Sequence, residues 1–387
     1  ARAALGRMSY GRPVRRVLTS ILSALVLAAA CAGAKPKATP ERAAPRASSA
    51  PRATAAPTAS SIPEGPASPR RAKPDAPTAK APVKKGPPEP GACPSGMVLV
   101  SGDYCSEVEH ECKKSWYDKS NKKTVCEEFE PVSRCVGDKT QKRFCIDEYT
   151  WPNRKGARPE VMNRFHQAEL KCAAVGKRLC TESEWTMACE GPKLLPFPYG
   201  YVRDTKKCHG DLDWDSPDMK KVAARDPAEL ARLWKGKRNG SQPECVSDYG
   251  VYDLPGNVDE VVSSESFHLP GYKGKFDSVH TGGPWYKGVR NQCRPKIYTH
   301  DEAFYYYFLG FRCCAEPDGK TTDPRTPYQI EKKWKLERVE RSAGFTLDQM
   351  KMKLELIEKK QCTCSDKDIL CKTMCGTLLG PEAKDVP

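Results

Sequence analysis

Cysteine offers more chemistry than any other residue type in this chain of 387 residues, which contains 19 cysteines. A thiolate can form a disulfide, bind a soft metal ion or act as a nucleophile. Cytosolic proteins rarely hold so many thiols without metal-binding spacing, so the count favours an oxidising compartment. Without Cys31, 18 cysteines remain, an even number compatible with nine disulfides, and most of their pairings stay open.

The first 31 residues predict an export signal that ends in a lipid-attachment site. Arginines precede an apolar run at residues 17–30, which is too short for a comfortable membrane span. Residues 27–31, Leu-Ala-Ala-Ala-Cys, resemble a bacterial lipobox, so we expect Cys31 to carry the lipid. Ala32 after it implies the outer membrane. The alternative is an ordinary signal peptide that happens to contain a cysteine.

Residues 32–92 predict a disordered tether. They contain 14 Pro with abundant Ala, Ser, Thr and Arg, and no aromatic residue or Cys, so they cannot bury enough apolar surface to fold. Residues 1–92 also hold 16 Lys/Arg against 4 Asp/Glu, and therefore +12 of the formal net charge of +15. Because the rest of the chain is nearly neutral, we do not expect nucleic acid as a partner.

The middle of the chain contains the elements that must position the cysteines. An alternating apolar pattern in residues 93–100 predicts a first strand, and residues 144–149 predict a second. An amphipathic pattern predicts a helix around residues 165–173. Thr181, followed three residues later by Glu184, forms a capping-box pattern that predicts the start of a second helix.

The same region contains five short motifs in a characteristic order. They are Gly176–Trp185 (GKRLCTESEW), Phe197–Gly200 (FPYG), Gly250–Glu260 (GVYDLPGNVDE), Gly282–Trp285 (GGPW) and Gly310–Cys313 (GFRC). Together they resemble the sulfatase-modifying factor family, whose founding member is the formylglycine-generating enzyme. The resemblance implies that residues 93–318 form an α+β domain with this family's variant of the C-type-lectin-like fold, irregular and disulfide-rich.

The resemblance also implies an oxidase chemistry whose metal site this chain lacks. Formylglycine generation oxidises a substrate cysteine with copper(I) and oxygen, and the family holds the metal with two cysteines after a G-G-S motif. Those positions are Lys287 and Gln292 here, and the serine of the oxygen pocket is Pro284. A one-residue gap would bring Cys293 onto the second position and leave the first without a thiolate. We therefore do not expect copper.

Two disulfides are implied by the resemblance, Cys172 with Cys313 and Cys189 with Cys293. The second would remove Cys293 from metal binding, and disulfides that close such long loops would stabilise a domain with little regular structure.

Calcium is the metal that the resemblance favours, because hard cations prefer carboxylate and carbonyl oxygens. The family's ligands fall on the side chains of Asn257 and Glu260 and on the backbone at Gly256 and Val258. Asp259 replaces the family's tryptophan and could add a ligand or disturb the site.

Two further residue sets are expected to be structural. The six histidines show no paired spacing, so nothing supports the three-histidine iron site found elsewhere in the superfamily. The aromatic run at residues 304–308 predicts a packed strand, one face of which could present tyrosines to a partner.

Residues 319–387 extend beyond the family domain and predict a small helical module. A charged helix is expected over residues 328–340, and Thr346 with Gln349 forms a second capping box that opens another helix. Four cysteines follow between residues 362 and 375 and favour two disulfides, with a zinc site as the alternative. The module is expected to pack on the main domain or to be tethered to it.

These features predict an exported, lipid-anchored protein of the cell envelope whose domain acts as a non-catalytic binding or structural module. The expected partners are the membrane, through the lipid on Cys31, and an envelope protein or glycan. Calcium is the expected cofactor. The alternative function is an oxidase that converts a cysteine of a substrate protein and uses Cys293 in an altered metal site.

Overall fold

The computed structural model describes residues 91–119, 122–265, 276–286, 288–331 and 334–359. The predicted signal peptide, Cys31 and nearly all of the predicted tether lie outside these residues, as do the four C-terminal cysteines. No helix in the described ranges is long and apolar enough to span a membrane.

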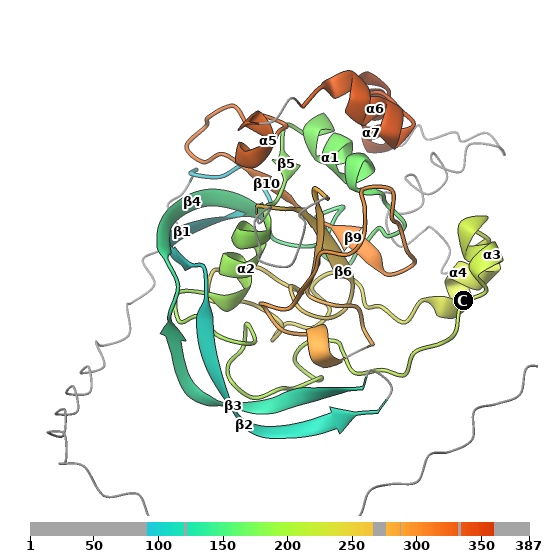
Figure 1. Ribbon diagram of the computed structural model, residues 1–387. Coiled ribbons are helices and arrows are strands. Elements are labelled where there is room, and N and C mark those ends of the chain that lie inside the picture. Colours follow the sequence, from blue (N-terminus) through green and yellow to red (C-terminus); the bar gives the residue numbers. More distant parts are fainter. Residues whose placement is uncertain (1–90, 120–121, 266–275, 287, 332–333, 360–387) are drawn as a thin grey trace, which may run out of the picture. The chain divides into compact units, whose positions relative to one another are not determined.

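Three sheets form the framework of the domain (Figure 1). The first has the strand order β1-β4-β10-β5, the second is the β2-β3 ribbon, and the third has the order β8-β7-β6-β9. The strands are β1 (Met97–Cys105), β2 (Val108–Asp118), β3 (Lys123–Cys135), β4 (Lys139–Asp147), β5 (Arg178–Leu179), β6 (Asp259–Ser263), β7 (Ser278–Thr281), β8 (Lys296–Ile297), β9 (Leu309–Phe311) and β10 (Cys313–Ala315).

The third sheet brings distant parts of the chain together. Strand β6 pairs antiparallel with β7 and parallel with β9, with Glu260 opposite Thr281 on one side and Gly310 on the other. All five residues of β6 are buried. A short strand buried on both sides suits the centre of a sheet, so side chains on β6 are well placed to form a fixed site.

Two predicted helices are confirmed close to their expected bounds. Helix α1 (Phe165–Ala174) buries Phe165, Ala168 and Cys172 against the core. Helix α2 (Glu182–Glu190) begins with the predicted capping box, because Thr181 accepts a hydrogen bond from the backbone of Glu184 and the Glu184 side chain accepts one in return. The remaining short helices of this part are α3 (Met219–Ala223), α4 (Pro227–Leu233) and the 3₁₀ turn η1 (Gly288–Arg290).

Seven disulfides pair every cysteine of the described residues: Cys93–Cys145, Cys105–Cys135, Cys112–Cys126, Cys172–Cys313, Cys180–Cys314, Cys189–Cys293 and Cys208–Cys245. Two of them are the pairs that the family resemblance implies. Cys180, which stands where the family motif has proline, pairs with the neighbour of Cys313. The Cys172–Cys313 and Cys180–Cys314 bridges, called here the twin disulfides, therefore tie α1 and the start of α2 to β10.

The described part of the C-terminal extension packs on the main domain. Helices α6 (Leu336–Ala343) and α7 (Leu347–Glu358) lie beside α1 (Figure 1). Their buried residues form one cluster with Leu170 of α1. The predicted capping box at Thr346 is present. The single helix expected over residues 328–340 is wrong, since α5 (Pro327–Glu331) ends before α6 begins.

The strand expected over residues 304–308 is also wrong. Strand β9 begins only at Leu309, and the aromatic run before it is irregular at residues 304–306 and forms a turn at residues 307–308. Tyr307 and Phe308 both pack around Trp285 in one buried cluster, with ring centroids 6.0 and 6.4 Å from that indole. Adjacent side chains that share one cluster cannot alternate between two faces as a strand requires.

Candidate functional site

Glu260, predicted as a calcium ligand, forms a buried ion pair with Arg312. The Arg312 Nε and Nη2 atoms donate to Glu260 Oε2 and Oε1 at 2.7 and 2.9 Å. Trp185 Nε1 donates to Oε2 at 2.7 Å, and the Thr150 hydroxyl donates to Oε1 at 2.6 Å. Both partners of the ion pair are fully buried, so the negative charge of Glu260 is neutralised within the core.

The side chain of Asn257 is likewise engaged within the protein. Its Oδ1 accepts the backbone N–H of Lys237 at 2.7 Å, and its Nδ2 donates to the Lys237 carbonyl. Gly256 adopts a φ of +77°, and a Cβ there would clash with the carbonyl oxygen of His209, so the glycine serves a close turn. Val258 is buried in the core.

This arrangement does not fit the calcium site implied for Asn257 and Glu260. The carboxylate that would coordinate the ion binds a guanidinium instead, and the amide oxygen holds a neighbouring loop. Among the described residues no group of three or more His, Cys, Asp or Glu side chains is arranged to hold a metal ion.

The segment that carries copper ligands in the oxidases contains a closed disulfide here. Cys293 is fully buried and bonded to Cys189. Gln292 precedes it, and Lys287 lies outside the described residues. A disulfide sulfur and an amide cannot replace two thiolates, so the residues of this segment do not fit copper(I).

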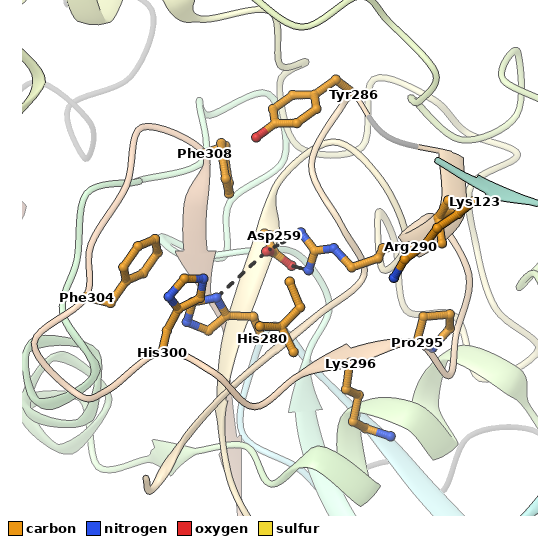
Figure 2. Close-up of a pocket in the computed structure, with 12 residues that line it drawn as sticks. Lys123, Asp259, His280, Tyr286, Arg290, Pro295, Lys296, His300, Phe304 and Phe308 are labelled. Carbon is orange, nitrogen blue, oxygen red and sulfur yellow. Dashed lines mark hydrogen bonds and ion pairs between the residues drawn. The ribbon is translucent and has the colours of Figure 1, made fainter. Parts of the chain in front are cut away.

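A cavity of about 440 Å³ lies beside the third sheet, at the same segment (Figure 2). It is lined from β6, β7, η1, β8 and the loop before β9, with Lys123 from the start of β3. Its chemically active side chains are Asp259, His280, Arg290, Lys296 and His300. Its apolar lining includes Phe304 and Phe308.

Asp259, the residue in place of the family tryptophan, lines this cavity and lies between Arg290 and the two histidines (Figure 2). Arg290 binds it through two hydrogen bonds, from Nη1 to Oδ1 at 3.0 Å and from Nη2 to Oδ2 at 2.8 Å. The backbone N–H of Gly283 also donates to Oδ1, at 3.2 Å. Burial raises the pKa of Asp259, and the Arg290 charge opposes that rise.

Two histidines lie next to this ion pair. The Nδ1 atom of His280 is 3.9 Å from Asp259 Oδ2, and the His280 and His300 rings stack at 5.1 Å between centroids. His300 stacks in turn on Phe304 at 3.8 Å. Burial lowers the pKa of His280 well below its ordinary value, and the nearby His300 and Arg290 lower it further. Burial also lowers the pKa of His300, so both rings are neutral near pH 7.

The family follows from comparison with known proteins. Residues 108–317 match the model of the sulfatase-modifying factor enzyme 1-like domain. The chain belongs to this family. It is similar to a solved structure titled "Crystal Structure of CarF", with 14% identity, a TM-score of 0.38, and coverage of 58% of this chain and 99% of that chain. It is also similar to the structure of Treponema denticola variable protein 1, with 14% identity, a TM-score of 0.31, and coverage of 57% and 95%. No curated protein sequence matches the chain.

The predicted α+β, disulfide-rich fold of this family is confirmed. The family match begins at residue 108, yet β1 before it pairs with β4 over its whole length, from Met97 opposite Asp147 to Cys105 opposite Lys139. The first strand is therefore an integral part of the domain's first sheet.

Proposed function

We propose that this protein is an exported, lipid-anchored binding module of the cell envelope, built on a sulfatase-modifying factor domain that does not oxidise cysteine. The observation that carries the proposal is the Cys189–Cys293 disulfide. Cys293 is the cysteine that the oxidase alternative would use, and in this bond it has no thiolate to offer. Cysteine-dependent copper chemistry needs two thiolates in that segment.

The cavity at the same segment supports binding as the remaining role. Its volume of about 440 Å³ falls within the range of roughly 300–1,000 Å³ that is typical of small-molecule sites. It combines aromatic walls with a few polar groups, which is the usual composition of such sites. An envelope glycan or the side chains of an envelope protein are the proposed partners.

Export and anchoring are proposed from the N-terminal sequence and the cysteine chemistry. An arginine-containing segment, an apolar run and the lipobox-like residues before Cys31 have the order of a lipoprotein signal. Seven disulfides are the pattern of a domain that matures in an oxidising compartment. The Pro-rich residues 32–92 would then act as a spacer between the membrane and the domain.

Peptide mapping of the non-reduced protein by mass spectrometry tests the catalytic part of the proposal. We expect a Cys189–Cys293 linked peptide, no copper(I) binding at the domain and no oxidation of a cysteine-containing peptide. The Cys189→Ala variant, which frees the Cys293 thiol, is the matched control for thiol detection. A free Cys293 in the wild-type protein, together with peptide oxidation, would refute the binding-module proposal in favour of the oxidase.

Lipid attachment is tested separately in a bacterial host. We expect the wild-type protein to partition with membranes and its N-terminal peptide to carry acyl chains on Cys31, whereas a Cys31→Ser variant should be released. Equal membrane association of the two proteins would contradict the proposed anchor.

A further inference from the structure

The cavity contains a buried hydrogen-bonding atom that the fold itself does not use. The side chain of His280 is 2% exposed, and its Nε2 atom has no hydrogen-bond partner among the described residues. Buried polar groups are nearly always hydrogen-bonded, because leaving one unpaired costs free energy. A ligand that enters this cavity could satisfy the atom.

The surroundings of His280 determine what that ligand must provide. The ring is neutral near pH 7, because burial lowers its pKa and the neighbouring His300 and Arg290 lower it further. Since Nδ1 faces the Asp259 carboxylate at 3.9 Å, we assign the single ring proton to Nδ1. Nε2 is then an acceptor, and the group that pairs with it must be a donor such as a hydroxyl.

The charge of the lining favours an acid. Lys123, Arg290 and Lys296 are cationic, and Asp259 is the one carboxylate that the described lining contains. Arg290 already neutralises Asp259, so Lys123 and Lys296 are the remaining basic groups of the lining, with Glu182, Glu190 and Glu265 near Lys296. Burial lowers the pKa of Lys296, and an anion beside it would raise that pKa again and stabilise the charged form.

The apolar lining provides a surface for a ring. His300 and Phe304 are stacked on each other, and Phe308 and Tyr286, which pack edge to face, add to the aromatic lining (Figure 2). The C–H face of a sugar ring packs well against such aromatic surfaces, while its hydroxyls remain free to donate at the ring edge.

We propose that this cavity binds a sugar acid, a ring that brings hydroxyl donors to His280 and a carboxylate to the lysines at the cavity's edge. The aromatic side chains contact the ring face, and the Asp259–Arg290 pair lies beside Nδ1 of His280. This inference rests on the proposed binding function and names the ligand class of that same site.

Glucuronate and glucose are the probes that separate the contribution of the carboxylate to binding from that of the sugar ring. For the full chain, calorimetry should detect glucuronate binding at least about tenfold tighter than glucose binding. The Nε2 resonance of His280 in a nitrogen-15 spectrum should shift when glucuronate is added. A uronate oligosaccharide that binds more tightly than the monosaccharide supports a glycan source, whereas equal affinity supports the free acid.

Two lysine variants test the site without disturbing the core. Lys123→Gln, at the exposed start of β3, should weaken glucuronate binding about threefold to tenfold. Lys139→Gln, at the exposed start of β4 and outside the cavity lining, should leave it unchanged. His280→Leu should reduce affinity by at least about tenfold, with circular dichroism confirming that the variant folds.

The sugar-acid inference is overturned if the full chain does not bind glucuronate, if glucose binds equally well, or if the His280 Nε2 resonance does not move. These outcomes differ from failure of the proposed function, which appears as a free Cys293 thiol with cysteine oxidation and requires no sugar.

Discussion

Replacement of Glu260 by glutamine separates the two roles that this residue could have. The substitution keeps the size of the side chain but removes the charge that Arg312 neutralises. Both side chains are fully buried, so the variant leaves an unpaired guanidinium in the core. Removing one partner of a buried ion pair typically costs about 3–5 kcal/mol of unfolding free energy.

The expected effect is large enough to measure by thermal or urea denaturation. For a domain of this size, each 1 kcal/mol shifts the melting temperature by about 2–4 °C, so the Glu260→Gln variant should melt roughly 6–20 °C below wild type. Glu109→Gln is a matched control, because its partner Arg134 lies 3.0 Å away with both side chains more than half exposed. Removing that exposed pair should cost at most about 1 kcal/mol.

Calcium provides the second half of the test. If Glu260 acts through Arg312, the difference between the variant and wild type is the same with excess calcium and with a chelator. If Glu260 were a calcium ligand, the chelator would destabilise wild type by mass action and would reduce that difference. A Glu260→Gln variant within about 0.5 kcal/mol of wild type, or a difference that disappears on chelation, would refute the assignment.

Three further predictions concern stability. Burial raises the pKa of Asp253 to about 6, so the folded protein holds this proton more tightly than the unfolded chain, and stability falls as the pH rises through that value. The stability of Asp253→Asn relative to wild type should therefore rise by about 3 kcal/mol between about pH 4 and pH 8. A stability difference between the two proteins that does not change with pH would contradict this prediction. Met350→Ala removes a fully buried side chain and should lower the free energy of unfolding by about 2–5 kcal/mol, with urea denaturation still showing a single transition. Met352→Ala, at a position 62% exposed, should change the free energy of unfolding by no more than about 0.5 kcal/mol. Removing one twin disulfide should lower the free energy of unfolding by about 3 kcal/mol, because the remaining one reduces the loop that it closes to about ten residues. Removing both should cost about 1 kcal/mol more than the sum of the single losses, because Cys189–Cys293 still limits the open loop to about 30–40 residues. Additive losses in urea denaturation would refute that coupling.

Local chemistry explains why parts of the fold could be predicted from the sequence. A capping box depends on residues three apart, so the starts of α2 and α7 were visible at Thr181 and Thr346. The periodic apolar positions of α1 face a buried cluster and predicted that helix for the same reason. These features need no information from distant parts of the chain.

The β2–β3 ribbon is an element that local sequence patterns do not predict. Nearly all of β2 is exposed, so its sequence lacks the alternation of apolar and polar residues that would predict a strand. The ribbon is closed by Cys112–Cys126 across its strands and by Cys105–Cys135 at its base. The two disulfides therefore help to specify this ribbon, together with the buried Val125 and Phe129 of β3, and the sequence alone could not assign the cysteine pairings.

The cavity was the feature that could least be predicted without the fold. His280 and His300 are 20 positions apart without a shared motif, and Asp259 and Arg290 are 31 apart, so only the third sheet and the loop before β9 bring them together. Asp259 attracted notice as a charged residue in place of the family's tryptophan, but a buried carboxylate is tolerable only with a partner. Arg290 supplies that partner from the segment that carries copper ligands in the oxidases. The unexpected aspartate and the absent thiolates are therefore features of one cavity, and this is why we interpret the segment as a site for binding.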